Sequence, residues 1–177
     1  MCIRDRLGRE HVVRDSLRKT KSLEEYDFVF FDNPPSISLI TVNSLVASHC
    51  FIVPVSADFL PLTGLQLLSQ SFEKVKAVRE DFFCLGILLT LYARNERICR
   101  QVESVLQKEY AETLFKTKIR VNTKGKSAPS VTQTIFEYEN SPKGRGTEDF
   151  GSLADEFLER VGNFFEIGNT EKRVANE

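Results

Sequence analysis

The sequence predicts an α/β fold in which a mostly parallel β-sheet is flanked by helices. Apolar runs of strand length alternate with longer segments whose apolar residues lie along one side. The runs are apolar at nearly every position, which is typical of strands buried on both faces of a parallel sheet. One run ends in an aspartate, and in open α/β sheets ligands bind at the carboxyl ends of the strands.

The first half of the chain predicts two strands and three helices. The polar segment Leu7–Leu23 is expected to be helical, and the run Phe28 to Phe31 predicts a strand over Asp27–Asp32. A helix over Ile37–Ser48 and a strand over Cys50–Val55 follow. Pro61 suits the first turn of a long helix that ends near Arg79, with leucines along one side.

The second half predicts two more strands and two more helices. The strands are Cys84–Tyr92 and Leu114–Ile119, and the helix Ile98–Tyr110 lies between them. A loop rich in Gly, Pro, Ser and Asn is expected from Arg120, before a last helix over Thr147–Phe165. We expect one domain over residues 7–167, with an unrelated leader at 1–6 and a polar, frayed tail at 168–177.

Composition and charge favour an ordinary globular protein of the cytoplasm. Of the 177 residues, 41% are hydrophobic and 28% charged, and the net charge of −1 makes any nucleic-acid surface a local one. The four cysteines form no CxxC pair and have no histidine at metal-ligand spacing, which favours free thiols. No apolar run is long enough to span a bilayer.

A candidate site follows the predicted first strand. Asp32 ends the apolar run, and a carboxylate in that position can hold Mg²⁺ directly or through its water shell. Pro34 and Pro35 stop the strand and stiffen the turn. Ser36 can then cap the next helix or contact nucleotide-bound water. A plain aspartate in a turn explains the same residues.

The segment YDFVFFDNPPSISLITVNSLVASHCFIVPVSADFLPLTGLQLL resembles the middle of the ParA-type partition ATPases, a deviant-Walker group that includes MinD. Shorter stretches farther along, including ILLTLY, LFKTKI, APS and SPKGRGTEDFGSLADEFL, match later parts of that family in order. The resemblance covers about Leu7 to Val161 and implies a fold like that of P-loop NTPases. The positions that carry it in the first segment are Asp32, Pro34, Pro35, Ser36, Asn43, Leu45, Ala47, Pro54, Gly64 and Leu65.

The chain departs from this family in lacking its lysine-bearing phosphate loop. The triplet Gly125-Lys126-Ser127 looks like the end of such a loop, but Arg120 stands where its first glycine belongs. The triplet also runs into Ala128 and Pro129 rather than opening a helix. We therefore expect an incomplete fold without the amino-terminal β-α units, a fragment that does not hydrolyse ATP appreciably on its own.

A local basic surface lies between Phe115 and Lys126, which carries five basic residues and no acid. The resemblance implies non-specific DNA binding through this loop, with Lys124 where the family commonly has arginine. A second family arginine follows the third strand but is not cleanly kept here, where Arg94 and Arg97 lie close by, so that this contact is shifted or lost. A solvated basic edge is the competing explanation. The candidate DNA-binding residues are Arg94, Arg97, Arg120, Lys124 and Lys126.

The resemblance also implies residues that frame an adenine base. In the family an Ile-Pro-x-Asn run serves this role, and the chain keeps Asn122 of that run but not the proline. Thr90, at the end of the third strand, also falls where it could face the base. Ala128 and Pro129 belong to the matching APS stretch. The competing explanation is that Thr90 and Asn122 satisfy backbone groups.

The resemblance implies ATP and Mg²⁺ as cofactors in the intact protein, with Asp32 as the metal-positioning residue. It further implies an ATP-dependent homodimer, non-specific DNA on the nucleoid and a ParB-like stimulating partner. The alternatives are a non-catalytic DNA-tethering or dimerisation module of the same fold, or a MinD-like positioning ATPase. A membrane-bound form is disfavoured because residues 148–166 are acidic on their polar side. A phosphoacceptor receiver domain is disfavoured because no acidic pair precedes Asp32.

Overall fold

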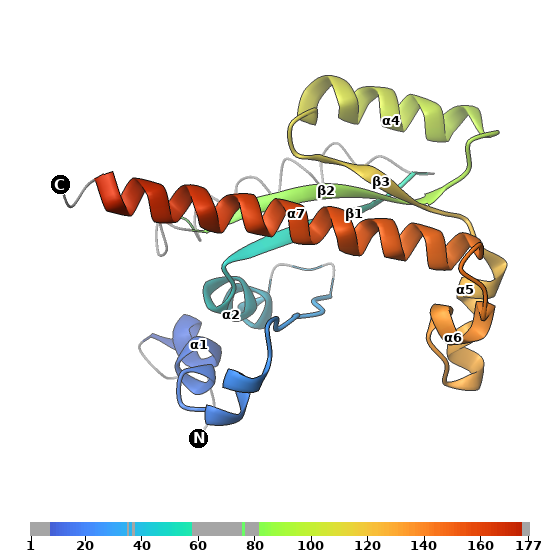
Figure 1. Ribbon diagram of the computed structural model, residues 1–177. Coiled ribbons are helices and arrows are strands. Elements are labelled where there is room, and N and C mark those ends of the chain that lie inside the picture. The colour runs from blue at the N-terminus through green and yellow to red at the C-terminus, as the bar shows by residue number, and fades with distance from the viewer. Residues whose placement is uncertain (1–7, 35, 37, 58–75, 77–81, 175–177) are drawn as a thin grey trace. The chain divides into compact units, whose positions relative to one another are not determined.

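The computed structural model describes residues 8–34, 36, 38–57, 76 and 82–174, the side chains only as far as residue 163. The chain divides into two compact units, Met1–Phe51 with Pro61–Cys84 and Ile52–Leu60 with Leu85–Glu177. Each unit is described by itself (Figure 1). The long helix expected from Pro61 to Arg79 lies almost wholly outside the described residues, with Lys76 alone assigned as helical.

Short helices make up most of the described part of the first unit. They are the 3₁₀ helices η2 (Arg9–His11) and η3 (Lys21–Glu25), and the α-helices α1 (Val12–Leu17) and α2 (Leu39–Ala47). The Ser38 side chain caps α2 by accepting a hydrogen bond from the Thr41 backbone N–H. The buried Asn43 side chain donates to the carbonyls of Arg9 and Leu39 and accepts from Val13 N–H, so it joins α2 to the preceding helices.

The strand predicted over Asp27–Asp32 is wrong for the described structure. These residues belong to no strand, and Phe28, Val29 and Phe30 are 42%, 48% and 73% exposed. An apolar strand is stable when neighbouring strands accept and donate its backbone hydrogen bonds and other layers cover its faces. None of the described strands pairs with this segment. The apolar pattern alone therefore did not determine whether a strand forms.

Three strands form the sheet in the order β1 (Cys50–Ser56), β2 (Phe83–Tyr92) and β3 (Leu114–Arg120). The strand predictions for these three segments are confirmed within one or two residues. β2 and β3 are parallel, with Ile87 opposite Leu114 and Tyr92 opposite Arg120. The sheet is therefore the parallel type that the continuous apolar runs predict.

The described helices of the second unit are α4 (Arg97–Tyr110), α5 (Thr123–Ser127), the 3₁₀ helix η4 (Ala128–Val131), α6 (Ile135–Glu139) and α7 (Arg145–Val174). Of these, α4 and α7 lie against the sheet, whereas the short helices lie near the start of α7 (Figure 1). α7 lies along the sheet and packs on β3. The α4 prediction is confirmed, and the buried face of this helix carries Cys99, Val102 and Leu106.

Two predictions for this region are corrected. The loop expected from Arg120 contains the short helices α5, η4 and α6, because Asn122 caps α5 and Thr134 with Glu137 forms a capping box on α6. α7 begins at Arg145 rather than Thr147 and continues to Val174, so residues 168–174 are helical rather than a frayed tail. The earlier start is explained by the Glu139 carboxylate, which accepts hydrogen bonds from N–H groups in the first turn of α7.

Among the described residues, no helix has the length and apolar character needed to cross a membrane.

Candidate functional site

The proposed metal-binding residue Asp32 lies in an extended, exposed segment of the first unit. Pro34 and Ser36 are also exposed, whereas Pro35 lies outside the described residues. Ser36 does not cap the following helix, since Ser38 has that role. Instead the Ser36 carbonyl accepts a hydrogen bond of 2.7 Å from the Thr41 hydroxyl.

The residues around Asp32 fit one carboxylate ligand of a Mg²⁺–nucleotide complex. The carboxylate is exposed and makes no hydrogen bond or ion pair within the described part of the chain. Mg²⁺ in nucleotide sites typically takes one or two carboxylates and fills its other positions with waters and phosphate oxygens. A single accessible aspartate is therefore a sufficient protein ligand, provided that other groups hold the phosphates. The 177 residues contain no phosphate loop to supply them.

Thr90 stands near the carboxyl end of β2, in the second unit. Its hydroxyl donates a hydrogen bond of 3.2 Å to the Val55 carbonyl, and its own carbonyl accepts one of 2.9 Å from Ala57 N–H. Both contacts hold the end of β1 against β2. The next residue, Leu91, has a positive φ of 51° and is 46% exposed. Few non-glycine residues adopt this conformation, so the backbone is strained where the strand ends.

Asn122 follows β3 and is held at both ends of its side-chain amide. The Nδ2 group donates to Glu139 Oε1 at 2.9 Å, and Oδ1 accepts from the Lys124 backbone N–H, also at 2.9 Å. Glu139 is 8% exposed and accepts further hydrogen bonds from Gly146 N–H and from the N–H and hydroxyl of Thr147. Asn122 therefore has a structural role in this conformation, whether or not it also contacts a base.

The same contacts change the acidity of Glu139. Burial raises the pKa of this carboxyl, but the hydrogen bonds from Thr147, Asn122 and Gly146 outweigh burial and lower the pKa from 4.5 to about 2. The group is therefore ionised at neutral pH, and its negative charge lies at the positive amino-terminal end of α7.

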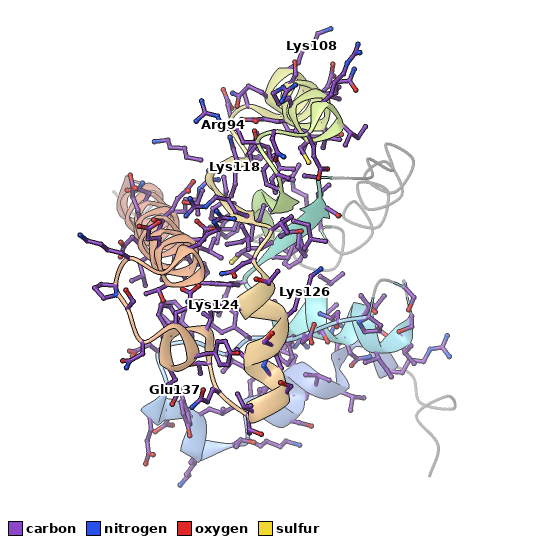
Figure 2. All side chains as sticks on the ribbon, turned by 90° about the vertical axis from the view of Figure 1, so that its right-hand side faces the viewer. Arg94, Lys108, Lys118, Lys124, Lys126 and Glu137 are labelled. Atoms are coloured by element: carbon purple, nitrogen blue, oxygen red, sulfur yellow. The ribbon has the colours of Figure 1, made fainter. Side chains whose placement is uncertain are left out.

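Two candidate DNA-binding lysines are free. Lys124 and Lys126 are exposed on α5, and their ammonium groups form no ion pair within the described part of the chain (Figure 2). Arg94 and Arg97 are likewise exposed, Arg94 in the turn after β2 and Arg97 at the start of α4. The Arg94 carbonyl accepts a hydrogen bond of 2.8 Å from the Arg100 guanidinium, which stabilises that turn.

Other basic residues of the predicted surface are paired with acids. Arg120 forms ion pairs with Asp149 and Glu148, at 2.6 Å and 3.0 Å, and its hydrogen bonds with these carboxylates raise its pKa. Lys118 is paired with Glu103 and lies 4.8 Å from the centre of the Tyr92 ring. The side chains of Lys116, Lys124 and Lys126 remain exposed, and two of these three lysines lie on α5.

The APS stretch lies in η4, directly after α5. Ala128 is buried, at 2% exposure, and Pro129 is exposed in the first turn of η4. Gly125-Lys126-Ser127 lies inside the five-residue α5 and does not precede a long helix. The triplet thus lacks the geometry of a phosphate loop.

Sequence reasoning missed the charged residues that fix α7 on β3. Arg160 donates to the carbonyls of Leu85, Thr113 and Leu114 and stacks 4.1 Å from the Phe115 ring centre. Glu156 accepts from the N–H groups of Lys116 and Thr117 and pairs with Arg160. The i,i+4 spacing of Glu156 and Arg160 was visible in the sequence, but their bonds to β3 were not.

Comparison with known proteins yields a consistent set of relatives. A family model described as an AAA domain matches residues 2–83. The chromosome-partitioning ATPase Soj of Thermus thermophilus is 35% identical over 155 residues, 87% of this chain and 60% of that protein. The cell division protein PomZ of Myxococcus xanthus is 34% identical over 158 residues, and this chain covers 47% of its length. The chain thus spans about half to three fifths of these two relatives.

Solved structures agree on the fold. A cobyrinic acid a,c-diamide synthase from Mycobacterium smegmatis, with bound ADP and magnesium, matches with a TM-score of 0.71 and 25% identity over 90% of this chain and 57% of that one. A plasmid partition protein from Borrelia burgdorferi matches at 20% identity with a TM-score of 0.55, over 77% of this chain and 53% of that one, and supports the fold alone. The fold is that of P-loop NTPases, and the sequence is similar to chromosome-partitioning proteins such as Soj and ParA.

Proposed function

We propose that this chain forms part of a ParA-type partition ATPase that binds DNA without sequence specificity. The observation that carries the proposal is the pair of exposed, unpaired lysines on α5, in a chain whose relatives are named as partitioning proteins. Lysines that neutralise phosphates release counterions, which supplies most of the free energy of non-specific binding. Arg94 and Arg97 extend this surface, while Arg120 supports it through its ion pairs with Asp149 and Glu148.

The nucleotide part of the proposal rests on Asp32 and on the residues after β2 and β3. When bound, Mg²⁺–ATP would supply the triphosphate charge that Asp32 helps to neutralise through the metal. Pro34, Pro35 and Ser36 would form the turn that senses the γ-phosphate. Thr90, Asn122, Ala128 and Pro129 would frame the base. The structure with bound ADP and magnesium supports nucleotide binding in this fold.

The assembly part of the proposal follows the relatives. Two copies would dimerise with ATP between them, DNA would bind across the dimer on the nucleoid, and a ParB-like partner would stimulate hydrolysis and release. A second candidate, an ATPase that positions the division site, is favoured by the similarity to the cell division protein PomZ. Binding of purified ParB-like or division-site partners distinguishes the two.

The test of the DNA surface is a double charge reversal, Lys124→Glu with Lys126→Glu. We expect weaker binding to a labelled duplex of arbitrary sequence. Between about 50 and about 200 mM salt, the slope of the logarithm of the binding constant against the logarithm of the salt concentration should become shallower, by the amount expected for the loss of about two phosphate contacts. Fluorescence anisotropy at several salt concentrations measures both quantities.

The matched control is Lys19→Glu with Lys21→Glu, which makes the same change in net charge at exposed lysines of the first unit. The control should retain the wild-type salt slope. An unaltered slope in the Lys124 and Lys126 variant, or an equal change in both variants, contradicts the proposed surface.

A further inference from the structure

We propose that Glu139 is the positioning residue that holds the basic helix α5 in the orientation required for DNA binding. The inference rests on the proposed function, since it assigns a role toward the surface formed by Lys124 and Lys126. Glu139 itself is buried and contacts no DNA-binding lysine directly. Its effect therefore has to pass through the residues to which it is hydrogen-bonded.

One carboxylate joins the end of β3 to the start of α7. Glu139 Oε1 accepts from Asn122 Nδ2 at 2.9 Å and from Gly146 N–H at 3.2 Å. Oε2 accepts from the Thr147 N–H at 2.8 Å and from its hydroxyl at 3.0 Å. Hydrogen bonds to an ionised, buried acceptor are the stronger kind, so this junction is stiff.

Asn122 connects the Glu139 carboxylate to α5. The oxygen of its amide caps the helix through the Lys124 backbone N–H, while Glu139 holds the nitrogen of the same amide. A five-residue helix is marginal in isolation, because it gains little from its own hydrogen bonds. The orientation of α5, and with it the direction of the two lysines, therefore depends on how Asn122 is held.

Two glycines leave room for this arrangement of the carboxylate. A Cβ atom added to Gly144 would overlap the Glu139 carboxylate, and one added to Gly146 would overlap Ile135. Both glycines lie at the start of α7, and a larger residue at Gly144 would force the Glu139 side chain to move.

Glu137 offers a matched comparison on the same short helix. It lies two residues before Glu139, is exposed, and bonds only to Thr134 within the capping box of α6. Neutralising Glu137 removes one negative charge near α5, as neutralising Glu139 does. It leaves every contact of Asn122, Gly146 and Thr147 intact.

The experiment compares Glu139→Gln, Glu139→Asp and Glu137→Gln by DNA anisotropy over the same salt range, with thermal unfolding in parallel. We expect Glu139→Gln to weaken DNA binding roughly threefold to tenfold at temperatures where the variant is fully folded. Glu139→Asp should recover part of the loss, and Glu137→Gln should bind like the wild type. Asn122→Ala should weaken binding in the same direction, and its effect should not add to that of Glu139→Gln.

The inference is overturned if a folded Glu139→Gln variant has the DNA affinity and salt slope of the wild type. The proposed function still stands in that case, provided that the double lysine reversal weakens binding. Should Glu139→Gln fail to fold, Asn122→Ala decides, because it keeps the bonds from Glu139 to Gly146 and Thr147. Unchanged affinity in Asn122→Ala then overturns the inference. A lysine reversal without effect removes the proposed function and this inference together.

Discussion

Carboxylates that are buried or partly buried organise the part of the chain that carries the candidate DNA surface. Asp149 holds Arg120, Glu156 holds the backbone of β3, and Glu139 holds Asn122 and the start of α7. Each accepts hydrogen bonds from backbone N–H groups as well as from side chains. Buried charges are tolerated when they are satisfied in this way, and removing one acceptor leaves several donors unpaired.

The pH dependence of stability should report Glu139 directly. Its folded-state pKa of about 2 lies below the ordinary value of 4.5, so the ionised group stabilises the fold fully above about pH 4.5. That contribution is lost as the pH falls toward 2. We expect Glu139→Gln to lower the free energy of unfolding by about 1–3 kcal/mol at neutral pH.

Denaturant unfolding between about pH 6 and about pH 3 measures the effect. The difference between the wild type and Glu139→Gln should shrink as the solution is acidified. Glu25→Gln, at an exposed position in η3, serves as the control. A difference that stays constant over this range would mean that the charge of Glu139 is not what stabilises the junction.

For single residues, the sequence showed which side chains are charged but not which partners they bind in the fold. The basic residues Lys124 and Lys126 were visible in the sequence, and the structure leaves both side chains exposed. Arg120 was not recognised as an ion-paired residue, because its partner Asp149 is 29 residues away. Glu139 gave no signal beyond being an acid near Gly144, since its donors come from two separate segments, at Asn122 and at Gly146 and Thr147.

The junction between α7 and β3 is the best-defined contact between two elements of the second unit. Arg160 crosses from the helix to three backbone carbonyls at the amino-terminal ends of β2 and β3, and Glu156 satisfies N–H groups of β3. Lys116 and Thr117 belong to β3, which is an outer strand of the described sheet. The pair therefore closes this side of the sheet with side chains.

Arg160→Met should separate this polar role from simple packing. The substitution retains an apolar side chain of similar length over Phe115 but removes all the donors, so we expect a loss of roughly 2–4 kcal/mol in the free energy of unfolding. Denaturant unfolding measures it, with the exposed Glu159→Gln on the same helix as the control. A loss below about 1 kcal/mol, the usual value for surface pairs, would show that the ion pair is peripheral.

Most elements could be predicted because periodicity is local. β1, β2, β3, α2 and α4 match their predictions closely, since each carries its apolar pattern within its own residues. The structure of the segment Asp27–Asp32 could not be predicted from its own residues, because a strand forms only where neighbouring strands from other parts of a chain pair with it. The helices α5 and α6 were not predicted because each has only five residues and begins at a cap, Asn122 or Thr134, of a residue type that is also common in loops.

At the scale of the whole molecule, the relatives extend well beyond this chain, which covers 60% of the Thermus thermophilus protein. The 177 residues supply Asp32 and the basic helix α5 but no lysine-bearing phosphate loop. We therefore expect the nucleotide control of DNA binding, rather than DNA binding itself, to require both parts. A form of the protein carrying a phosphate loop ahead of Leu7 should bind DNA in a nucleotide-dependent way.

The most direct test is the DNA affinity of that form with and without Mg²⁺–ATP, together with its ATP turnover. We predict that Mg²⁺–ATP tightens DNA binding, and that Asp32→Ala abolishes both the tightening and the Mg²⁺-dependent turnover while the protein remains folded. Asp27→Ala, an exposed acid of the same extended segment, should retain both. Equal DNA affinity with and without nucleotide, or full turnover in Asp32→Ala, would contradict the account.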